Sequence, residues 1–161
     1  MRIIGIDPGL TKTGVGIIDV INNSLNFVYC DTIYSTPDQK MADRLSHFHK
    51  SLLQIIQLYK PNFASIEETF VNKNPISSLK LGHARGALML TLGMCELDVA
   101  EYSSTAIKKT IVGVGRADKN QVQAMIKILL PKAKFSTEDE ADALAIAICH
   151  HHNKNNWNKF V

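Results

Sequence analysis

Two acidic residues each stand where a short, mainly apolar run ends. Asp7 follows the apolar residues 3–6 and precedes Pro8-Gly9, which cannot continue the hydrogen-bond ladder of a sheet. Glu67 ends a second such run at residues 63–66. The carboxyl ends of neighbouring parallel strands lie roughly 5 Å apart, at the edge where α/β sheets usually bind ligands. We therefore expect both carboxylates to face one crevice.

Asp139 and Asp142 form a second acidic pair. A helix is predicted to begin at Thr137, because Thr137 and Glu140 have the spacing of a capping box. Residues three apart share one face of a helix, and apolar side chains continue this face further along. The pair is therefore expected at the inward-facing start of a packed helix. For Glu138 and Glu140 we adopt the alternative that first-turn acids merely interact favourably with the helix dipole.

Carboxylates gathered at one place would raise one another's pKa values, and a divalent cation would remove that repulsion. Ligands that are all carboxylate oxygens favour hard ions, so we expect Mg²⁺, with Mn²⁺ as an alternative. Two such ions can activate a water and stabilise the leaving oxygen of a phosphodiester. The histidines and the three cysteines show no zinc-type spacing that would compete with this interpretation.

The composition is that of an ordinary soluble protein. The chain has 161 residues, 45% hydrophobic and 20% charged, which suits one domain with a full core. We expect a single nuclease-sized domain at residues 1–155 and a short tail at 156–161. No apolar run is long enough to span a bilayer, no signal peptide precedes the first strand, and three cysteines do not form a disulfide framework. A cytoplasmic protein without membrane contact is predicted.

Charge is distributed unevenly along the sequence. Residues 73–134 contain ten Lys or Arg and four Asp or Glu, a net charge of +6, whereas residues 135–142 contain four acids and no base. A basic region beside a concentrated acidic one suggests a polyanion held over a metal-binding pocket. A solvated mixed surface is the alternative interpretation.

Hydrophobic periodicity and turn residues predict an α/β fold. Three strands precede a helix, then strand, helix, strand and further helices follow. Because a helix separates it from the first strands, the fourth strand is predicted to run parallel to the first. Thr36 or Asp38 can cap the first helix. The result is a five-stranded mixed sheet, its first three strands antiparallel, with helices on both faces; the strands are expected at 2–7, 13–20, 25–34, 63–67 and 99–102, and the helices at 41–59, 76–94, 105–112, 118–130 and 137–152.

Several of these segments together resemble the RuvC family of Holliday-junction resolvases. The similar segments are found in order along nearly the whole chain, at residues 5–9, 66–70, 79–86, 110–115, 119–122 and 140–145. The resemblance implies a ribonuclease-H-like fold and a homodimer that resolves four-way DNA junctions by paired symmetric nicks, using divalent metal. It also implies action together with the RuvA–RuvB branch-migration complex.

The resemblance implies roles for particular residues. The metal-binding acids of the family fall on Asp7, Glu67, Asp139 and Asp142. The aromatic residue that contacts the opened junction falls on Phe70, and important lysines fall on Lys108 and Lys119.

The residues themselves allow further DNA contacts. A ring at Phe70 could stack on an unpaired base, with Lys73 beside it, and Lys108, Arg116 and Lys119 bracket a glycine loop where they could hold phosphates. The alternatives are a loop anchor for Phe70 and helix-end solvation for the basic residues.

The predicted helix at residues 76–94 is apolar nearly all round. One face should pack on the sheet and the other needs a partner, which favours a two-fold dimer, although burial within its own domain is an alternative. Two other functions compete with junction cleavage. A phosphotransferase is suggested by a similarity of residues 5–9 to the phosphate loop of actin-like and sugar-kinase ATPases, and a non-cleaving nucleic-acid-binding module of the same fold is the second.

Overall fold

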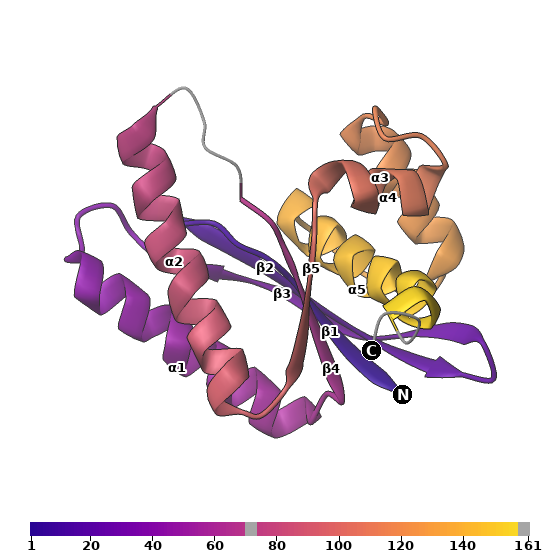
Figure 1. Ribbon diagram of the computed structural model, residues 1–161, viewed down its shortest axis with the longest axis horizontal. Helices are drawn as coiled ribbons and strands as arrows, with labels where there is room; N and C mark the ends of the chain where they lie inside the picture. The colour runs from indigo at the N-terminus through magenta and orange to yellow at the C-terminus, as the bar shows by residue number, and fades with distance from the viewer. Residues whose placement is uncertain (70–73, 158–161) are drawn as a thin grey trace.

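A five-stranded sheet forms the centre of the molecule (Figure 1). The computed structural model describes residues 1–69 and 74–157. The strand order is β3-β2-β1-β4-β5, in which β2 is antiparallel to β1 and β3, while β4 and β5 run parallel to β1. The predicted mixed sheet is therefore confirmed. The strands are β1 (Arg2–Asp7), β2 (Lys12–Ile21), β3 (Ser24–Tyr34), β4 (Phe63–Glu67) and β5 (Asp98–Tyr102).

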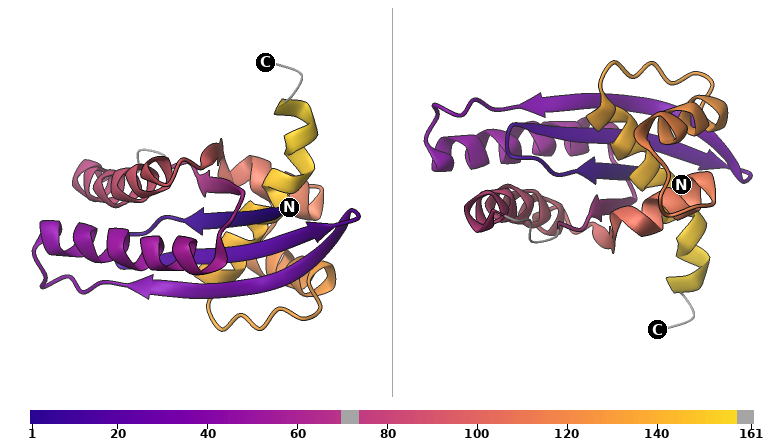
Figure 2. Two further views of the ribbon diagram at one scale, coloured as in Figure 1. Left: turned by 90° about the horizontal axis from the view of Figure 1, so that it is seen from below. Right: turned by 90° about the horizontal axis from the view of Figure 1, so that it is seen from above.

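Helices cover both faces of this sheet, as predicted (Figures 1 and 2). Apolar side chains of α1 and α2 pack on one face, and those of α3, α4 and α5 pack on the other. None of the helices in the described residues is long and apolar enough to cross a membrane. The helices are α1 (Met41–Tyr59), α2 (Pro75–Met94), α3 (Ser104–Val112), α4 (Lys119–Leu129) and α5 (Glu138–Trp157).

The hairpin between β2 and β3 turns at Asn22 and Asn23. Both residues have positive φ angles, 50° and 63°. Asparagine tolerates this left-handed conformation better than most residues, and two such residues in a row give the turn that matches the twist of paired strands. The predicted hairpin is thus confirmed together with its turn residues.

The predicted cap of α4 is confirmed, whereas the predicted cap of α1 is wrong. Asp118 caps α4 in a full capping box with Gln121, as expected of its residue type. The expected cap of α1 by Thr36 or Asp38 is wrong, because the helix begins only after Lys40 and no side chain caps it. A hydrogen bond from the backbone N–H of Gln39 to the carbonyl of Thr36 closes a separate turn and keeps this segment outside the helix.

The start of α5 corrects the interpretation of Glu140. The hydroxyl of Thr137 accepts from the Glu140 N–H at 3.2 Å, as a capping residue should. The Glu140 carboxylate, however, is buried and accepts from the backbone N–H of Ser136 at 2.7 Å. It therefore does more than interact with the helix dipole. The helix also continues to Trp157, beyond the expected end near residue 152.

Helix α5 lies directly on the backbone of β1 and β2. A Cβ atom at Gly14 would be 2.0 Å from the carbonyl oxygen of Asp139, and one at Gly5 would be 2.2 Å from that of Ala143. Only glycine permits this close approach. The acidic start of α5 thus lies so close to the backbone of β2 that no side chain would fit between them.

Candidate active site

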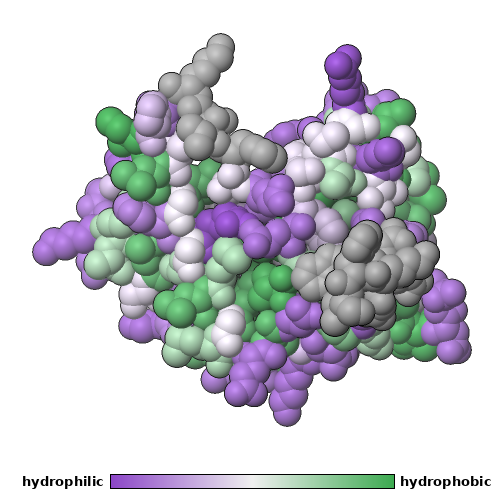
Figure 3. Space-filling view, viewed as in Figure 1, coloured by the Kyte–Doolittle hydropathy of each residue, from purple (hydrophilic) through white to green (hydrophobic). Residues whose placement is uncertain are grey.

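Strands β1 and β4 place Asp7 and Glu67 at the same edge of the sheet. The two strands are parallel neighbours, with Ile6 opposite Ile66, so the residue that follows each lies at the same level. The two carboxylates line one crevice of about 270 Å³, and Asp142 of α5 lines it from the side. Glu67 is 60 positions from Asp7 and 75 positions from Asp142 in the sequence, yet all three side chains line the same crevice. Figure 3 shows hydrophilic residues gathered in the hollow between α2 and the α3–α4 pair.

The acids in and beside this crevice perturb one another. Burial raises the pKa of Asp7 to about 8, with further contributions from the charge of Glu67 and Asp142, a hydrogen bond with Glu67, and the charge of Asp139. Burial also raises the pKa of Asp142 to about 6, although Lys119 opposes the shift. The crevice therefore retains protons unless positive charge compensates the carboxylates.

Asp139 stands apart from the other three acids. It does not line the crevice, and its backbone carbonyl rests against Gly14, but its charge contributes to the raised pKa values of Asp7 and Asp142. Within residues 1–69 and 74–157, no three His, Cys, Asp or Glu side chains are already arranged to hold a metal ion. A bound ion would therefore require these carboxylates to reorient toward it.

The donor set fits a hard divalent cation. The side chains concerned offer carboxylate oxygens only. Burial, and after it the negative charge of neighbouring acids, raises the pKa of Asp7, and a cation would neutralise that charge. Asp7, Glu67 and Asp142 could hold such an ion together. Asp139 is close enough for its charge to act on Asp7.

Two of the predicted basic residues border the same crevice. Lys108 and Lys119 both line it. The Nζ of Lys119 donates to Glu138 at 2.7 Å, and this hydrogen bond raises the pKa of the lysine. Arg116 is exposed and does not line the crevice. Phe70 and Lys73 lie outside the described residues.

Two arginines that the sequence did not single out hold the backbone at Glu67 and just after Asp7. The Nε of Arg85 donates to the carbonyl of Glu67 at 3.0 Å, and its guanidinium also pairs with Glu101. Arg44 is buried and donates to the carbonyl of Leu10 at 2.7 Å, in the loop that follows Asp7. Arg85 lies in the segment 79–86 that resembles the family, but neither the resemblance nor the pattern gave it a role, and it shares the predicted apolar helix with Lys80. Nothing comparable marks Arg44, whose helix has many polar residues.

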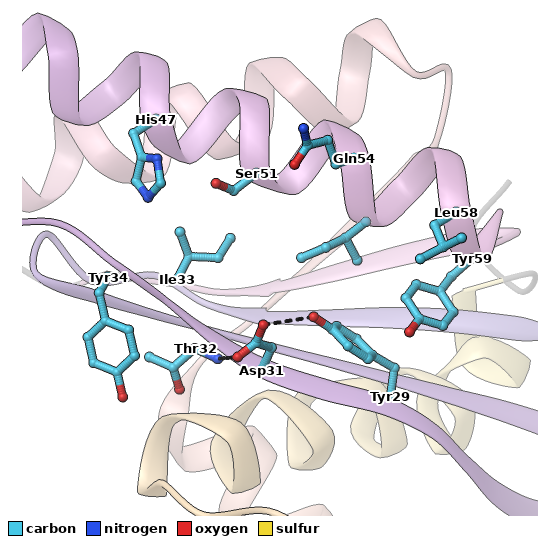
Figure 4. A pocket seen from close by; sticks show the side chains of 11 residues that line it. Tyr29, Asp31, Thr32, Ile33, Tyr34, His47, Ser51, Gln54, Leu58 and Tyr59 are labelled. Atoms are coloured by element: carbon cyan, nitrogen blue, oxygen red, sulfur yellow. Dashed lines mark hydrogen bonds between the residues drawn. The ribbon is translucent and has the colours of Figure 1, made fainter.

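A larger cavity lies on the opposite face of the sheet, between β3 and α1 (Figure 4). It measures about 500 Å³, and tyrosines form much of its wall. Its one carboxylate, Asp31, already accepts from the Tyr29 hydroxyl and the Thr32 backbone N–H, each at 2.8 Å. A single hydrogen-bonded carboxylate offers a metal ion little, so the smaller acidic crevice is the better candidate for catalysis.

The fold defines the class to which the molecule belongs. An antiparallel β1–β2–β3 unit extended by parallel β4 and β5, with helices on both faces, is the ribonuclease-H-like architecture. A family model described as "Crossover junction endodeoxyribonuclease RuvC" matches residues 3–150. The chain belongs to this RuvC family, whose members are metal-dependent nucleases.

Curated relatives agree with the family assignment. The RuvC protein of Rhizobium rhizogenes is 53% identical over 154 residues, covering 96% of this chain and 91% of the relative. The RuvC protein of Rhizobium etli is 51% identical over the same length and coverage. The predicted similarity of the separate motifs therefore extends over nearly the whole sequence.

Solved structures agree at the level of the fold. A structure of Thermus thermophilus RuvC has a TM-score of 0.88 and 26% identity, covering 98% of this chain and 97% of the other. The same protein in complex with Holliday junction substrate gives a TM-score of 0.90, again at 26% identity, with 98% and 96% covered. The yeast mitochondrial Holliday junction resolvase, at 13% identity and a TM-score of 0.66, shares the fold.

Proposed function

We propose that this chain is a crossover junction endodeoxyribonuclease, which resolves four-way DNA junctions by metal-dependent hydrolysis of phosphodiester bonds in recombination and repair. The family match over residues 3–150 supports the activity. The observation that carries the assignment of the site is the convergence of Asp7, Glu67 and Asp142 on one crevice. Membership of the RuvC family decides against the phosphotransferase alternative.

In this proposal Asp7, Glu67, Asp139 and Asp142 hold Mg²⁺, or Mn²⁺ in its place, as two ions in each site. When bound, the ions supply an activated water and stabilise the leaving oxygen. The carboxylates must lose their protons to take part, and burial, which raises the pKa of Asp7 to about 8, opposes this step at that residue. Lys119, at the wall of the crevice, can offset charge on the scissile phosphate.

DNA contacts are proposed on both sides of the crevice. Lys108 and Lys119 line it, and Arg116 is exposed near the start of α4, so all three can approach phosphates. Phe70 follows β4 closely in sequence and is proposed to stack on an unpaired base, with Lys73 contacting the backbone. Such contacts favour a branched substrate, in which bases are unpaired, over a linear duplex.

We further propose a homodimer formed through α2. Four large apolar side chains of this helix are between 63% and 67% exposed, and they recur along one stripe that also passes Gly82 and Gly86. Neither glycine has a neighbour within 4 Å of an added Cβ atom, so a second helix could approach closely. The stripe consists of Ile76, Leu79, Leu90 and Met94. Cooperation with RuvA–RuvB and a cytoplasmic location belong to the same proposal.

The test compares a four-way junction with a linear duplex of matched sequence, in Mg²⁺, in Mn²⁺ and in EDTA. The wild-type protein should nick the junction symmetrically and only with metal. Asp7→Asn should bind the junction in a gel-shift assay yet cut it at least about 100-fold more slowly, because the site loses a ligand. Junction binding without cleavage by the wild type would instead favour the non-cleaving module. Full nicking by Asp7→Asn would refute the site.

A further inference from the structure

Helix α5 carries Asp139 and Asp142 and crosses the whole sheet (Figures 1 and 2). Its later turns are tied to the strands one after another. The backbone of Ala143 rests on Gly5 of β1, the hydroxyl of Ser65 on β4 donates to the carbonyl of Ile146 at 3.3 Å, and the Tyr102 hydroxyl of β5 lies 3.0 Å from Nδ1 of His150. The helix therefore has a fixed register over the middle and far side of the sheet.

Glu140 forms the corresponding tie at the near side, on β3. Glu140 is only 6% exposed. One carboxylate oxygen accepts from the Ser136 N–H at 2.7 Å, and the other accepts from the Ser136 hydroxyl at 3.2 Å and from the Thr32 hydroxyl at 3.5 Å. The Thr32 hydroxyl also lies 2.7 Å from that of Thr137. Hydrogen bonds to a carboxylate are stronger than those between neutral groups.

The tie lies on the sheet row that carries Asp7. Thr32 of β3 pairs with Gly14 of β2, and Gly14 pairs with Asp7 of β1. The carbonyl of Asp139 rests against Gly14 in the middle of this row. The anchor of α5 and one acid of the crevice are therefore joined by neighbouring residues of three adjacent strands.

We propose that Glu140 is a positioning residue of the metal site. This inference rests on the function proposed above and deepens it. By fastening the first turn of α5 to Thr32, Glu140 fixes the distance between Asp142 and the sheet row that ends in Asp7. Glu140 itself faces β3 and does not line the crevice. Its effect on a bound ion therefore passes through the helix to Asp139 and Asp142.

The experiment measures Mn²⁺ binding to the DNA-free full chain by electron paramagnetic resonance, which does not depend on cleavage. The bound Mn²⁺ that the wild-type protein has and the Asp7→Asn protein lacks is assigned to the acidic crevice. Glu140→Gln keeps the size of the side chain but cannot accept at both oxygens, and Thr32→Val removes the partner hydroxyl without changing any charge. Loss of a group that orients metal ligands typically weakens metal binding about 10- to 100-fold. We expect about tenfold weaker binding for Glu140→Gln and a smaller loss for Thr32→Val, with the double variant no weaker than Glu140→Gln alone.

Asp19→Asn is the matched control. Asp19 is also a hydrogen-bonded carboxylate on the sheet, but it pairs with Arg2 at the opposite end of β1. The Mn²⁺ affinity of the Asp19→Asn protein should stay within about twofold of the wild type, since the carboxylate of Asp19 accepts hydrogen bonds from Arg2 and lies far along β1 from the crevice. Unchanged Mn²⁺ affinity in a folded Glu140→Gln protein would overturn the proposal.

Weaker binding in Glu140→Gln with normal binding in Thr32→Val would assign the effect to charge and would equally overturn it. If Glu140→Gln does not fold, Thr32→Val decides alone, and normal affinity there refutes the proposal. A wild-type protein that binds Mn²⁺ but does not nick junctions would contradict the proposed function and leave the positioning test valid.

Discussion

At the scale of single residues, Asp7 concentrates the electrostatic cost of the site. It is half-buried at a strand end beside Glu67 and Asp142, and burial together with the charge of these acids and of Asp139 raises its pKa to about 8 instead of 3.8. A residue type chosen for folding alone would not be an acid at this position, because burying an uncompensated carboxylate is unfavourable. Asp7 thus weakens the metal-free fold in exchange for a ligand at the crevice.

This cost predicts a pH dependence of the metal-free protein. In the unfolded chain Asp7 loses its proton near 3.8, whereas in the folded chain it keeps the proton until about 8. Between these values the folded state binds more protons, so stability falls as pH rises. Asp142, whose pKa is about 6, contributes to this fall in stability mainly below pH 6. Asp7→Asn should therefore remove the fall in stability that occurs between pH 6 and pH 8.

Thermal unfolding in EDTA at pH 6 and pH 8 would measure this effect. At pH 8 the Asp7→Asn protein should melt on the order of 5 °C higher than the wild type, which corresponds to about 2 kcal/mol for a chain of this size. The difference between the two proteins should shrink at pH 6. Parallel melting curves at both pH values would show that Asp7 is not the destabilising group.

At the scale of elements, the sequence predicted the features that are determined by residues close together in the chain. Strand β4 and the crevice-facing position of Glu67 followed from local pattern, as did the cap of α4 by Asp118. Glu140 and Arg85 could not be predicted in the same way. Their partners, Thr32 and Glu67, are 108 and 18 positions away in sequence. Only the packed arrangement of α5 on β3, and of α2 beside β4, brings these pairs together.

The close contact of α5 with β2 at Gly14 predicts the effect of a substitution there. Gly14→Ala would place a Cβ atom 2.0 Å from the Asp139 carbonyl oxygen, so the start of α5 must move away from β2. Overpacking of this kind costs roughly 1–3 kcal/mol, and we expect that loss in urea unfolding together with slower junction nicking. Gly93→Ala is the control, because an added Cβ atom there meets nothing within 4 Å. Equal stability of the two variants would show that α5 does not need this close contact.

At the scale of the whole molecule, the two faces of the sheet serve different purposes. The face covered by α5 carries the acids, whereas α2, on the other face, leaves an apolar stripe uncovered. A four-way junction has near two-fold symmetry, so two copies related by a two-fold axis can present two equivalent crevices to it. Cutting opposed strands symmetrically requires two such crevices, and the proposed dimer through the stripe would supply the second.

Leu90→Glu tests this requirement. Leu90 is 63% exposed in the middle of the α2 stripe, and a carboxylate buried against a second copy should weaken association at least about 100-fold. Leu58→Glu is the matched control, since Leu58 is 73% exposed on α1, away from the stripe. In sedimentation at micromolar concentration, the wild type and Leu58→Glu should be dimers, and Leu90→Glu should be a 17.9 kDa monomer. The Leu90→Glu monomer should still bind Mn²⁺ but lose paired nicking, because each crevice is complete within one chain. A wild-type protein that sediments as a monomer, or a Leu90→Glu protein that remains a dimer, would place the interface elsewhere or exclude it.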